Sequence, residues 1–349
     1  MMHSHATGQT ARSIRHAAIA LAVLGLPDSA VSQTRAPLAG VNLAGGEFNS
    51  GRKPGTYAKD YIYPDARIAA PFIAMGMKIV RVPLLWERLQ PSAAQPLSAS
   101  EIGRLDKVIA GLKGFEIIIL DIHNYGKRNG KRLDQMADGD AQFADLWRRL
   151  AERYREDPRI AFGLMNEPNG MAPAQWRRIV DAGVAAIRKA GARNLLLVPG
   201  SNWTGAHSWA AGGTRSNAAA FSDFRDPGSN YAFEMHQYLD PDSSGMKMQC
   251  EDAPVIRQRM MAATNWLRTN KHKGFLGEFG APPDARCLAS LDALLDHMHR
   301  NADVWMGWTY WAGGGWWGPN YPLSVQPVKG AARPQASILA KYSSRGARK

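Results

Sequence analysis

Cysteine is scarce in this sequence, since only Cys250 and Cys287 occur among its 349 residues. Neither lies in a C-x-x-C pair or in another spacing typical of metal ligands, so we expect no structural zinc site. In an exported protein, two isolated cysteines more often pair than stay free. The composition therefore predicts a single disulfide, with two buried free thiols as the alternative.

Long hydrophobic runs and linker-like tracts are also missing. The N-terminal apolar run at 17–26 is too short for a membrane span, which needs about twenty residues. Arg12 and Arg15 precede this run and small residues follow it, which is the layout of a secretory signal. We predict a signal peptide at 1–32 and a secreted or periplasmic protein with no membrane contact after signal removal. A disordered leader or an uncleaved anchor is the alternative.

Acidic residues are fewer than basic ones: the sequence has 30 Asp and Glu and 43 Lys and Arg, which gives a formal charge of +13. Residues 1–32 carry two of the arginines and one aspartate, so the remainder keeps +12. The basic residues are scattered in helix-like segments, as at Arg148-Arg149 and Arg177-Arg178, and no nucleic-acid-binding motif accompanies them. We predict a solvated basic surface and no nucleic-acid partner; strong salt-dependent binding to DNA would indicate the alternative.

A glycine-rich phosphate fingerprint is absent as well. After the first apolar run, residues 45–49 read Gly-Gly-Glu-Phe-Asn, with no G-x-G-x-x-G pattern, which disfavours an open doubly wound sheet. Eight apolar runs alternate instead with amphipathic segments, and this predicts a parallel sheet covered by helices, an α/β fold of the (β/α)8 TIM-barrel type. The runs lie at 39–44, 78–83, 116–121, 160–165, 194–199, 231–236, 274–278 and 304–311.

Polar and aromatic residues gather where these runs end, and the carboxyl ends of barrel strands form the mouth that holds active sites. Two glutamates stand out, because Glu167 and Glu278 each end an apolar run. Paired carboxylates at such a mouth are what glycoside hydrolysis requires. For an isolated His or Asn, capping or core hydrogen bonding is the alternative, but the convergence favours function. The further candidates at strand ends are Arg81, His123, Asn124, Asn166, His236, Tyr238 and Trp311.

Seven segments, in this order, cover nearly the whole chain after the signal and resemble glycoside hydrolase family 5 of clan A, in its endo-β-1,4-glucanase (cellulase) branch. The resemblance implies that residues 33–349 form a glycoside hydrolase catalytic barrel. The segments are Gly-Val-Asn-Leu at 40–43, Arg-Val-Pro at 81–83, Leu-Asp-Ile-His-Asn-Tyr at 120–125, Met-Asn-Glu-Pro at 165–168, His-Gln-Tyr-Leu-Asp at 236–240, Leu-Gly-Glu-Phe-Gly at 276–280 and Trp-Ala-Gly-Gly-Gly-Trp-Trp-Gly at 311–318.

The resemblance implies that Glu167 is the general acid/base and Glu278 the nucleophile of retaining hydrolysis, with the carboxyl groups about 5 to 5.5 Å apart. Arg81 and Tyr238 are expected to donate hydrogen bonds to ionised Glu278, whose charge favours protonated Glu167. His236 is expected to orient or tune Glu167.

The resemblance also implies sugar contacts for Asn166 at the 2-hydroxyl, for His123 in the same subsite, and for Asn124. No metal or cofactor is expected, because the two carboxylates suffice. Cys250 and Cys287 are expected to tie the loops after the sixth and seventh strands. The sequence departs from close relatives at 311–315, where Trp-Ala-Gly-Gly-Gly replaces a proline-containing version and puts the rigidity of that loop in doubt.

Eleven tryptophans are many, and an aromatic face suits the flat apolar face of a sugar ring. The resemblance implies that Trp311 lies under the sugar at the cleavage point, extended by Trp316 or Trp317. Trp203 is predicted to line a further subsite, and for Trp86 such a role and core packing are both open. Core packing is expected for Trp147, Trp176, Trp305 and Trp308.

The sequence therefore predicts a monomeric endo-β-1,4-glucanase that hydrolyses internal bonds of cellulose or mixed-linkage β-glucan, with a β-glucan polysaccharide or oligosaccharide as its partner. A β-mannanase or another β-glycanase is the alternative within the class. A catalytically silent carbohydrate-binding barrel is the alternative from another class, although the presence of Glu167, Glu278, Arg81 and Tyr238 disfavours it.

Overall fold

The computed structural model describes residues 1–3, 5 and 36–344. The predicted signal peptide at 1–32 lies almost wholly outside the described residues. Within the described part, no helix combines the length and the apolar character that crossing a membrane requires. The disulfide predicted from composition is present between Cys250 and Cys287.

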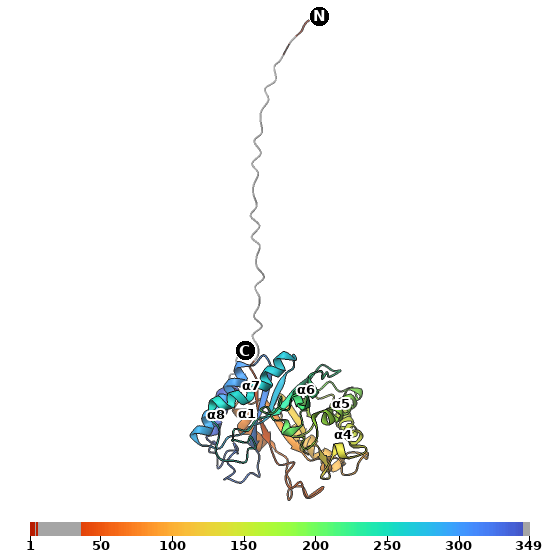
Figure 1. The fold of residues 1–349 in the computed structure, drawn as a ribbon, viewed down its shortest axis with the longest axis vertical. Helices are drawn as coiled ribbons and strands as arrows, with labels where there is room; N and C mark the ends of the chain where they lie inside the picture. The colour runs from red at the N-terminus through yellow and green to blue at the C-terminus, as the bar shows by residue number, and fades with distance from the viewer. Residues whose placement is uncertain (4, 6–35, 345–349) are drawn as a thin grey trace. The chain divides into compact units, whose positions relative to one another are not determined.

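Eight parallel strands close into a barrel in the order β1-β10-β9-β8-β7-β6-β3-β2. Each lies within two residues of a predicted apolar run, so the predicted TIM barrel is confirmed. Figure 1 shows the helices packed around the outside of these strands. The strands are β1 (Leu38–Leu43), β2 (Ile79–Leu84), β3 (Ile117–Ile122), β6 (Ile160–Gly163), β7 (Leu196–Pro199), β8 (Tyr231–His236), β9 (Gly274–Glu278) and β10 (Trp305–Gly313).

The helices between the strands present apolar stripes to the outer face of the barrel. Short 3₁₀ turns at η1 (Leu133–Gln135), η2 (Asn202–Thr204) and η3 (Gly213–Arg215) and a hairpin of β4 (Lys127–Arg128) and β5 (Lys131–Arg132) were not predicted, since two or three residues show no periodicity. The helices are α1 (Ala66–Ala74), α2 (Trp86–Leu89), α3 (Ala99–Gly111), α4 (Gly139–Tyr154), α5 (Pro173–Lys189), α6 (Asn217–Phe221), α7 (Ala253–Thr269), α8 (Ala285–Arg300) and α9 (Gln335–Ser343).

Among the described residues there are three apolar regions: one surrounds Trp311, and the other two pack the barrel. The larger lies between strands and helices, and it includes the fully buried Trp147, Trp176, Trp305 and Trp308, as predicted. Trp86 is also fully buried, which settles its open assignment in favour of core packing. The smaller region draws one residue from each of six strands: Ile79, Ile119, Ala161, Leu197, Ala232 and Phe275. The barrel interior is therefore filled by side chains, as in other TIM barrels, and its polar residues are left for the mouth.

Candidate active site

Arg81 on β2 is the centre of a buried polar network at the mouth of the barrel. Its side chain is fully buried, and burial alone would lower its pKa, but the surrounding carboxylates outweigh burial and raise it. The guanidinium therefore stays charged and holds residues from different strands in place. Its partners are Asn42 at 3.0 Å, Asp121 at 3.0 Å, Asn166 at 2.8 Å, Glu234 at 3.0 Å and Glu278 at 2.8 Å.

Glu278 ends β9, and both of its carboxylate oxygens accept hydrogen bonds. Nη1 of Arg81 donates to Oε1 at 2.8 Å, and the hydroxyl of Tyr238 donates to Oε2 at 2.9 Å, which matches the predicted donors. Burial raises the pKa of Glu278, whereas the charges of His236 and Arg81 lower it. Burial has the larger effect, so the net shift of the pKa is upward. The predicted hydrogen-bond donors, considered alone, had indicated a lowered pKa. The carboxylate is thus fixed in orientation and shielded from bulk water.

Glu167 follows β6 and has a positive φ of 44°, a backbone conformation that is costly for a residue with a side chain. The flanking backbone is tied down, because the amide of Asn166 donates to the carbonyl of Ile122 at 2.7 Å and the amide of Tyr125 to the carbonyl of Asn166 at 3.0 Å. Such strain persists only where the surroundings impose it, and it clusters at functional sites.

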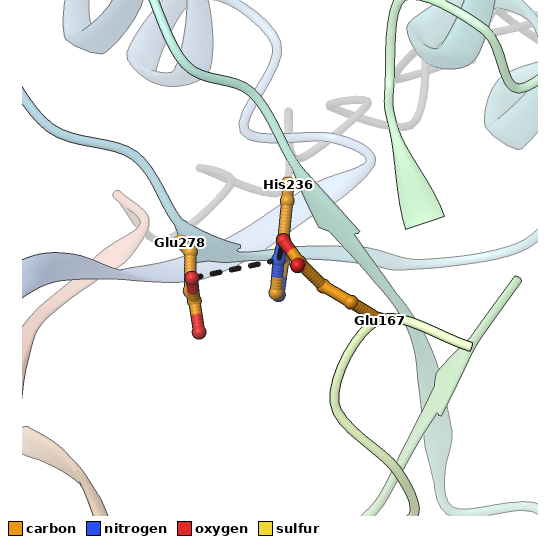
Figure 2. Close-up of side chains that lie close together, drawn as sticks. All are labelled: Glu167, His236 and Glu278. Atoms are coloured by element: carbon orange, nitrogen blue, oxygen red, sulfur yellow. Dashed lines mark hydrogen bonds and ion pairs between the residues drawn. The ribbon is translucent and has the colours of Figure 1, made fainter. Parts of the chain in front are cut away.

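His236, the last residue of β8, lies between the two glutamates (Figure 2). Its Nδ1 is 2.8 Å from Oε1 of Glu167 and 3.8 Å from Oε2 of Glu278, and its Nε2 is 3.4 Å from Oε1 of Glu234. Burial lowers the pKa of His236, but the charges and hydrogen bonds of Glu278, Glu167 and Glu234 raise it to about 10. A protonated His236 is therefore a donor to Glu167 at neutral pH.

The two glutamates and His236 form a compact group, in which one oxygen of each carboxylate and one ring nitrogen lie within 4.8 Å of one another. Such a group has donor atoms for a metal ion. However, a protonated imidazole has no lone pair to give, and each oxygen of Glu278 already accepts one hydrogen bond, from Arg81 or from Tyr238. The arrangement suits proton and glycosyl transfer better than metal binding.

His123 and Trp311 form one wall of the site. Their rings are stacked with centroids 5.5 Å apart, and Nδ1 of His123 is 2.8 Å from Oδ2 of Asp121. Burial lowers the pKa of His123, but the hydrogen bond and the charge of Asp121 raise it, and the net shift is upward. Nδ2 of Asn166 is buried and has no hydrogen-bond partner among the described residues, so its two N–H donors are unpaired.

An aromatic surface continues from Trp311. Its Nε1 donates to the hydroxyl of Tyr321 at 3.1 Å, and Trp317 stacks on Tyr321 with centroids 4.0 Å apart. Phe48 meets the edge of Trp317 at 4.8 Å. Trp316 is 36% exposed and lines a separate small cavity. Of the two predicted extensions of the Trp311 platform, Trp317 is therefore the one in contact with it.

Trp203 lines a larger cavity of about 590 Å³ that borders Glu167 and Tyr238. Its side chain is 53% exposed, so its indole face is open to solvent. The remaining walls come from the segment after β7 and the loop after β8, and they include His207, Ser243, Ser244 and Met246. The predicted Trp203 thus lies next to the predicted acid/base, in a cavity that also includes the predicted Tyr238 but whose remaining lining residues were not predicted.

Asn124 is held differently from the other predicted residues. Its Oδ1 accepts from the amide of Trp86 at 2.8 Å, and its Nδ2 donates to Glu87 at 2.8 Å. Both polar ends of Asn124 are thus engaged within the protein. The side chain supports the segment after β2 rather than presenting a free polar group to a ligand.

Asn42, Asp121 and Glu234 are site residues that the sequence reading did not single out. Asp121 and Glu234 each lie two positions before a predicted histidine; Glu234 and His236 are both on β8, whereas His123 directly follows β3. Residues two positions apart along extended backbone share a face. The sequence signal that could have revealed Asp121 and Glu234 is a charged residue within an otherwise apolar parallel strand. Asn42 donates to the carbonyls of Gly277 on β9 and Thr309 on β10 at 2.9 and 3.1 Å and so ties β1 to its neighbour β10 and to the next strand, β9.

A closed (β/α)8 barrel with two close carboxylates, an arginine-centred network and an aromatic cleft defines a glycoside hydrolase. The family model described as "Cellulase (glycosyl hydrolase family 5)" matches residues 34–314. The chain belongs to this family.

Individual relatives agree with this assignment. Endo-beta-1,4-glucanase A of Emericella nidulans is 35% identical over 307 residues, which are 87% of this chain and 91% of that protein. The structure of an endo-beta-1,4-glucanase from Xanthomonas axonopodis pv. citri has 45% identity and a TM-score of 0.86, and the match covers 88% of this chain and 99% of that one. A structure of XacCel5A in complex with cellopentaose has 47% identity and a TM-score of 0.86 over the same shares.

Proposed function

We propose that this protein is a retaining endo-β-1,4-glucanase that hydrolyses internal bonds of cellulose or mixed-linkage β-glucan. The observation that carries the proposal is the separation of the two glutamates, whose nearest oxygens lie within 4.8 Å. This closeness agrees with a retaining enzyme, in which the carboxyl groups are about 5 to 5.5 Å apart, and leaves no room for the intervening water of an inverting enzyme.

In the first step, Glu278 attacks the anomeric carbon while Glu167 protonates the departing oxygen. Arg81 and Tyr238 aim the attacking carboxylate, since each donates to one of its oxygens. In the second step, Glu167 takes a proton from water, which displaces Glu278 and restores both carboxyl groups. The unpartnered amide of Asn166 is suited to the sugar 2-hydroxyl, a contact that strengthens in the transition state.

The substrate proposal draws on the aromatic cleft and on the relatives. Trp311 and Trp317 form one group of aromatic rings, and the exposed ring of Trp203 lines a cavity with Glu167; aromatic faces of this kind suit sugar rings. Relatives bear the name endo-beta-1,4-glucanase, and one related structure is in complex with cellopentaose.

We propose further that residues 1–32 direct export and that residues 33–349 act as a monomer without a cofactor. The pattern of Arg12, Arg15 and the apolar run at 17–26 supports export. The disulfide between Cys250 and Cys287 agrees with an oxidising location.

The direct test is reducing-sugar release from carboxymethylcellulose, barley β-glucan and galactomannan by the wild type and Glu278→Gln. Glu152→Gln is the matched control, because Glu152 is an exposed glutamate on α4. We expect release from both glucans by the wild type and the control, and none by Glu278→Gln. Release from galactomannan alone would indicate a β-mannanase, and no release from any substrate would favour a binding protein.

A further inference from the structure

The segment after β1 is largely exposed, yet it supports the aromatic rings of the cleft. Residues 49–54 are exposed to solvent, so apolar burial contributes little to holding them in place. Phe48, just before them, packs against the edge of Trp317 with ring centroids 4.8 Å apart. Trp317 in turn meets the edge of Trp311 at 6.1 Å. The contacts that fix residues 46–54 therefore also support the rings next to Trp311.

A buried arginine outside the catalytic network supplies such contacts. Arg88 on α2 is only 1% exposed, and its guanidinium donates to three backbone carbonyls of the segment. The acceptors are the carbonyls of Gly46 at 2.5 Å, Phe48 at 2.6 Å and Pro54 at 2.8 Å. Because these carbonyls lie at both ends and within the segment, one planar guanidinium fixes the path of the whole segment.

The surroundings of Arg88 indicate that its charge serves these carbonyls rather than an ion pair. Among the described residues, no carboxylate lies within ion-pair distance of its guanidinium, which lies 3.8 Å from the ring centroid of Tyr61. Burial lowers the pKa of Arg88. A buried cation without a counterion is unfavourable, and charge-assisted hydrogen bonds to the carbonyls offset this penalty. A residue with fewer donors at this position should therefore release the segment.

Glu87, the residue before Arg88, provides a second anchor from the same helix. Its Oε1 accepts from Nζ of Lys53 at 2.8 Å, and its Oε2 accepts from Nδ2 of Asn124 at 2.8 Å. Asn124 directly follows His123. The short helix α2 thus connects the segment that supports Trp317 with the segment that carries His123.

We propose that Arg88 is a positioning residue of the glucanase, which holds residues 46–54 so that Phe48 keeps Trp317 and Trp311 in place for a sugar ring. The inference rests on the proposed function, because it assumes that these rings bind a glucan. Arg88 is buried and does not reach the substrate, so it acts on binding rather than on proton or glycosyl transfer. Its loss should raise KM and leave kcat nearly unchanged, as expected when binding is weakened equally in the ground state and the transition state.

The experiment measures kcat and KM of the full chain on neutral barley β-glucan, with kcat referred to the folded fraction from near-UV circular dichroism. We expect KM to rise about tenfold in Arg88→Met, the size expected for one lost aromatic contact, and to rise less in Arg88→Lys, which keeps the charge. Partial unfolding lowers the amount of active enzyme but does not raise KM, so a merely structural role would not give this result.

Arg188→Lys is the matched control. Arg188 on α5 is also buried and donates to backbone carbonyls, but it does so before β7 and β8, at the opposite end of the barrel, where it also pairs with Asp226. Its KM should stay within about twofold of the wild-type value. The carbonyls that accept from it belong to Ala192, Asn194 and Asn230.

Phe48→Ala tests the same connection without touching Arg88, and it keeps the inference testable if Arg88→Met does not fold. It should raise KM about as much as Arg88→Met does. The double variant Phe48→Ala with Arg88→Lys should raise KM no further than Phe48→Ala alone, because the two residues act through one contact.

The outcomes separate this inference from the function on which it rests. A KM that stays at the wild-type value in Arg88→Lys and Phe48→Ala, or additive effects in the double variant, would overturn the positioning role and leave the glucanase proposal intact. An equal rise in KM in Arg188→Lys would also overturn it, since the effect would not depend on residues 46–54. Failure of the wild type to cleave barley β-glucan would instead contradict the proposed function itself.

Discussion

At the scale of single side chains, the two glutamates are held by different partners, and their substitution should have different consequences. Glu167→Gln removes the proton donor and should lower activity on β-glucan by about 10²–10⁴-fold. An aryl cellobioside whose leaving group needs no protonation should be attacked at nearly the wild-type rate in that variant. Glu278→Gln should lose both activities, because no covalent intermediate forms.

Burst kinetics of the released phenol measure this difference. Glu167→Gln should show a rapid first turnover followed by slow release, since the second step still needs a base. Equal loss of activity on both substrates in the two variants would contradict the assigned roles.

The raised pKa of His236 predicts a pH dependence of stability. A histidine whose folded pKa exceeds its unfolded value near 6.5 stabilises the fold fully below that value, and the contribution disappears as pH rises towards about 10. Wild-type stability should therefore fall between pH 7 and 10 more steeply than that of His236→Gln, by at most about 1.4 kcal/mol per pH unit. Urea unfolding at pH 7, 8.5 and 9.5 measures both slopes, and parallel slopes would argue against a protonated His236.

At the scale of elements, α7 and α8 offer a matched pair of N-terminal caps. The side chain of Asp284 accepts from the amide of Cys287 at 3.1 Å, whereas that of Asp252 makes no capping bond to α7. Asp284→Ala should cost about 1 kcal/mol of unfolding free energy. Asp252→Ala should cost less than about 0.5 kcal/mol, because it removes only an exposed ion pair with Arg286.

Denaturant unfolding of the two variants provides the comparison. Because Cys287 is part of the disulfide, the experiment is run under oxidising conditions, where the cross-link is kept in both variants. Equal losses at Asp284 and Asp252 would mean that the capping bond contributes nothing beyond surface charge.

The strands could be predicted more reliably than the loops. A strand buried on both faces is a continuous apolar run, and each of the eight runs became a barrel strand. The turn at 202–204 carries no such pattern: its residues have left-handed backbone angles, and the amide of Trp203 donates to the carbonyl of Pro168. The cavity at Trp203 was therefore visible in the sequence only as a single aromatic residue after a strand.

At the scale of the whole molecule, the formal charge of +13 predicts different salt responses for charged and neutral substrates. Attraction between this basic protein and anionic carboxymethylcellulose is screened as the Debye length shrinks from about 30 Å at 0.01 M salt to about 10 Å at 0.1 M. We expect KM for carboxymethylcellulose to rise several-fold with salt, and KM for neutral barley β-glucan to stay constant. Initial rates at 10 and 300 mM NaCl test this, and equal responses would count against a role for net charge.

The amino-acid sequence by itself determined the barrel and the two glutamates. Both depend on local patterns, because a buried strand is an apolar run and a catalytic residue of a TIM barrel follows such a run directly. Trp147, Trp176, Trp305 and Trp308 could likewise be assigned to the core from their place in these patterns.

Only the tertiary structure decided how the site residues act on one another. The five partners of Arg81 come from four strands and from the segment after β6, and the charge of His236 depends on three carboxylates and on burial. The tertiary structure also distinguishes the two asparagines. The side chain of Asn124 is hydrogen-bonded to Trp86 and Glu87, whereas the side-chain nitrogen of Asn166 has no partner among the described residues. The physical reason is that electrostatic interactions and hydrogen bonds depend on distances through space, which residues far apart in the chain acquire only when the barrel closes.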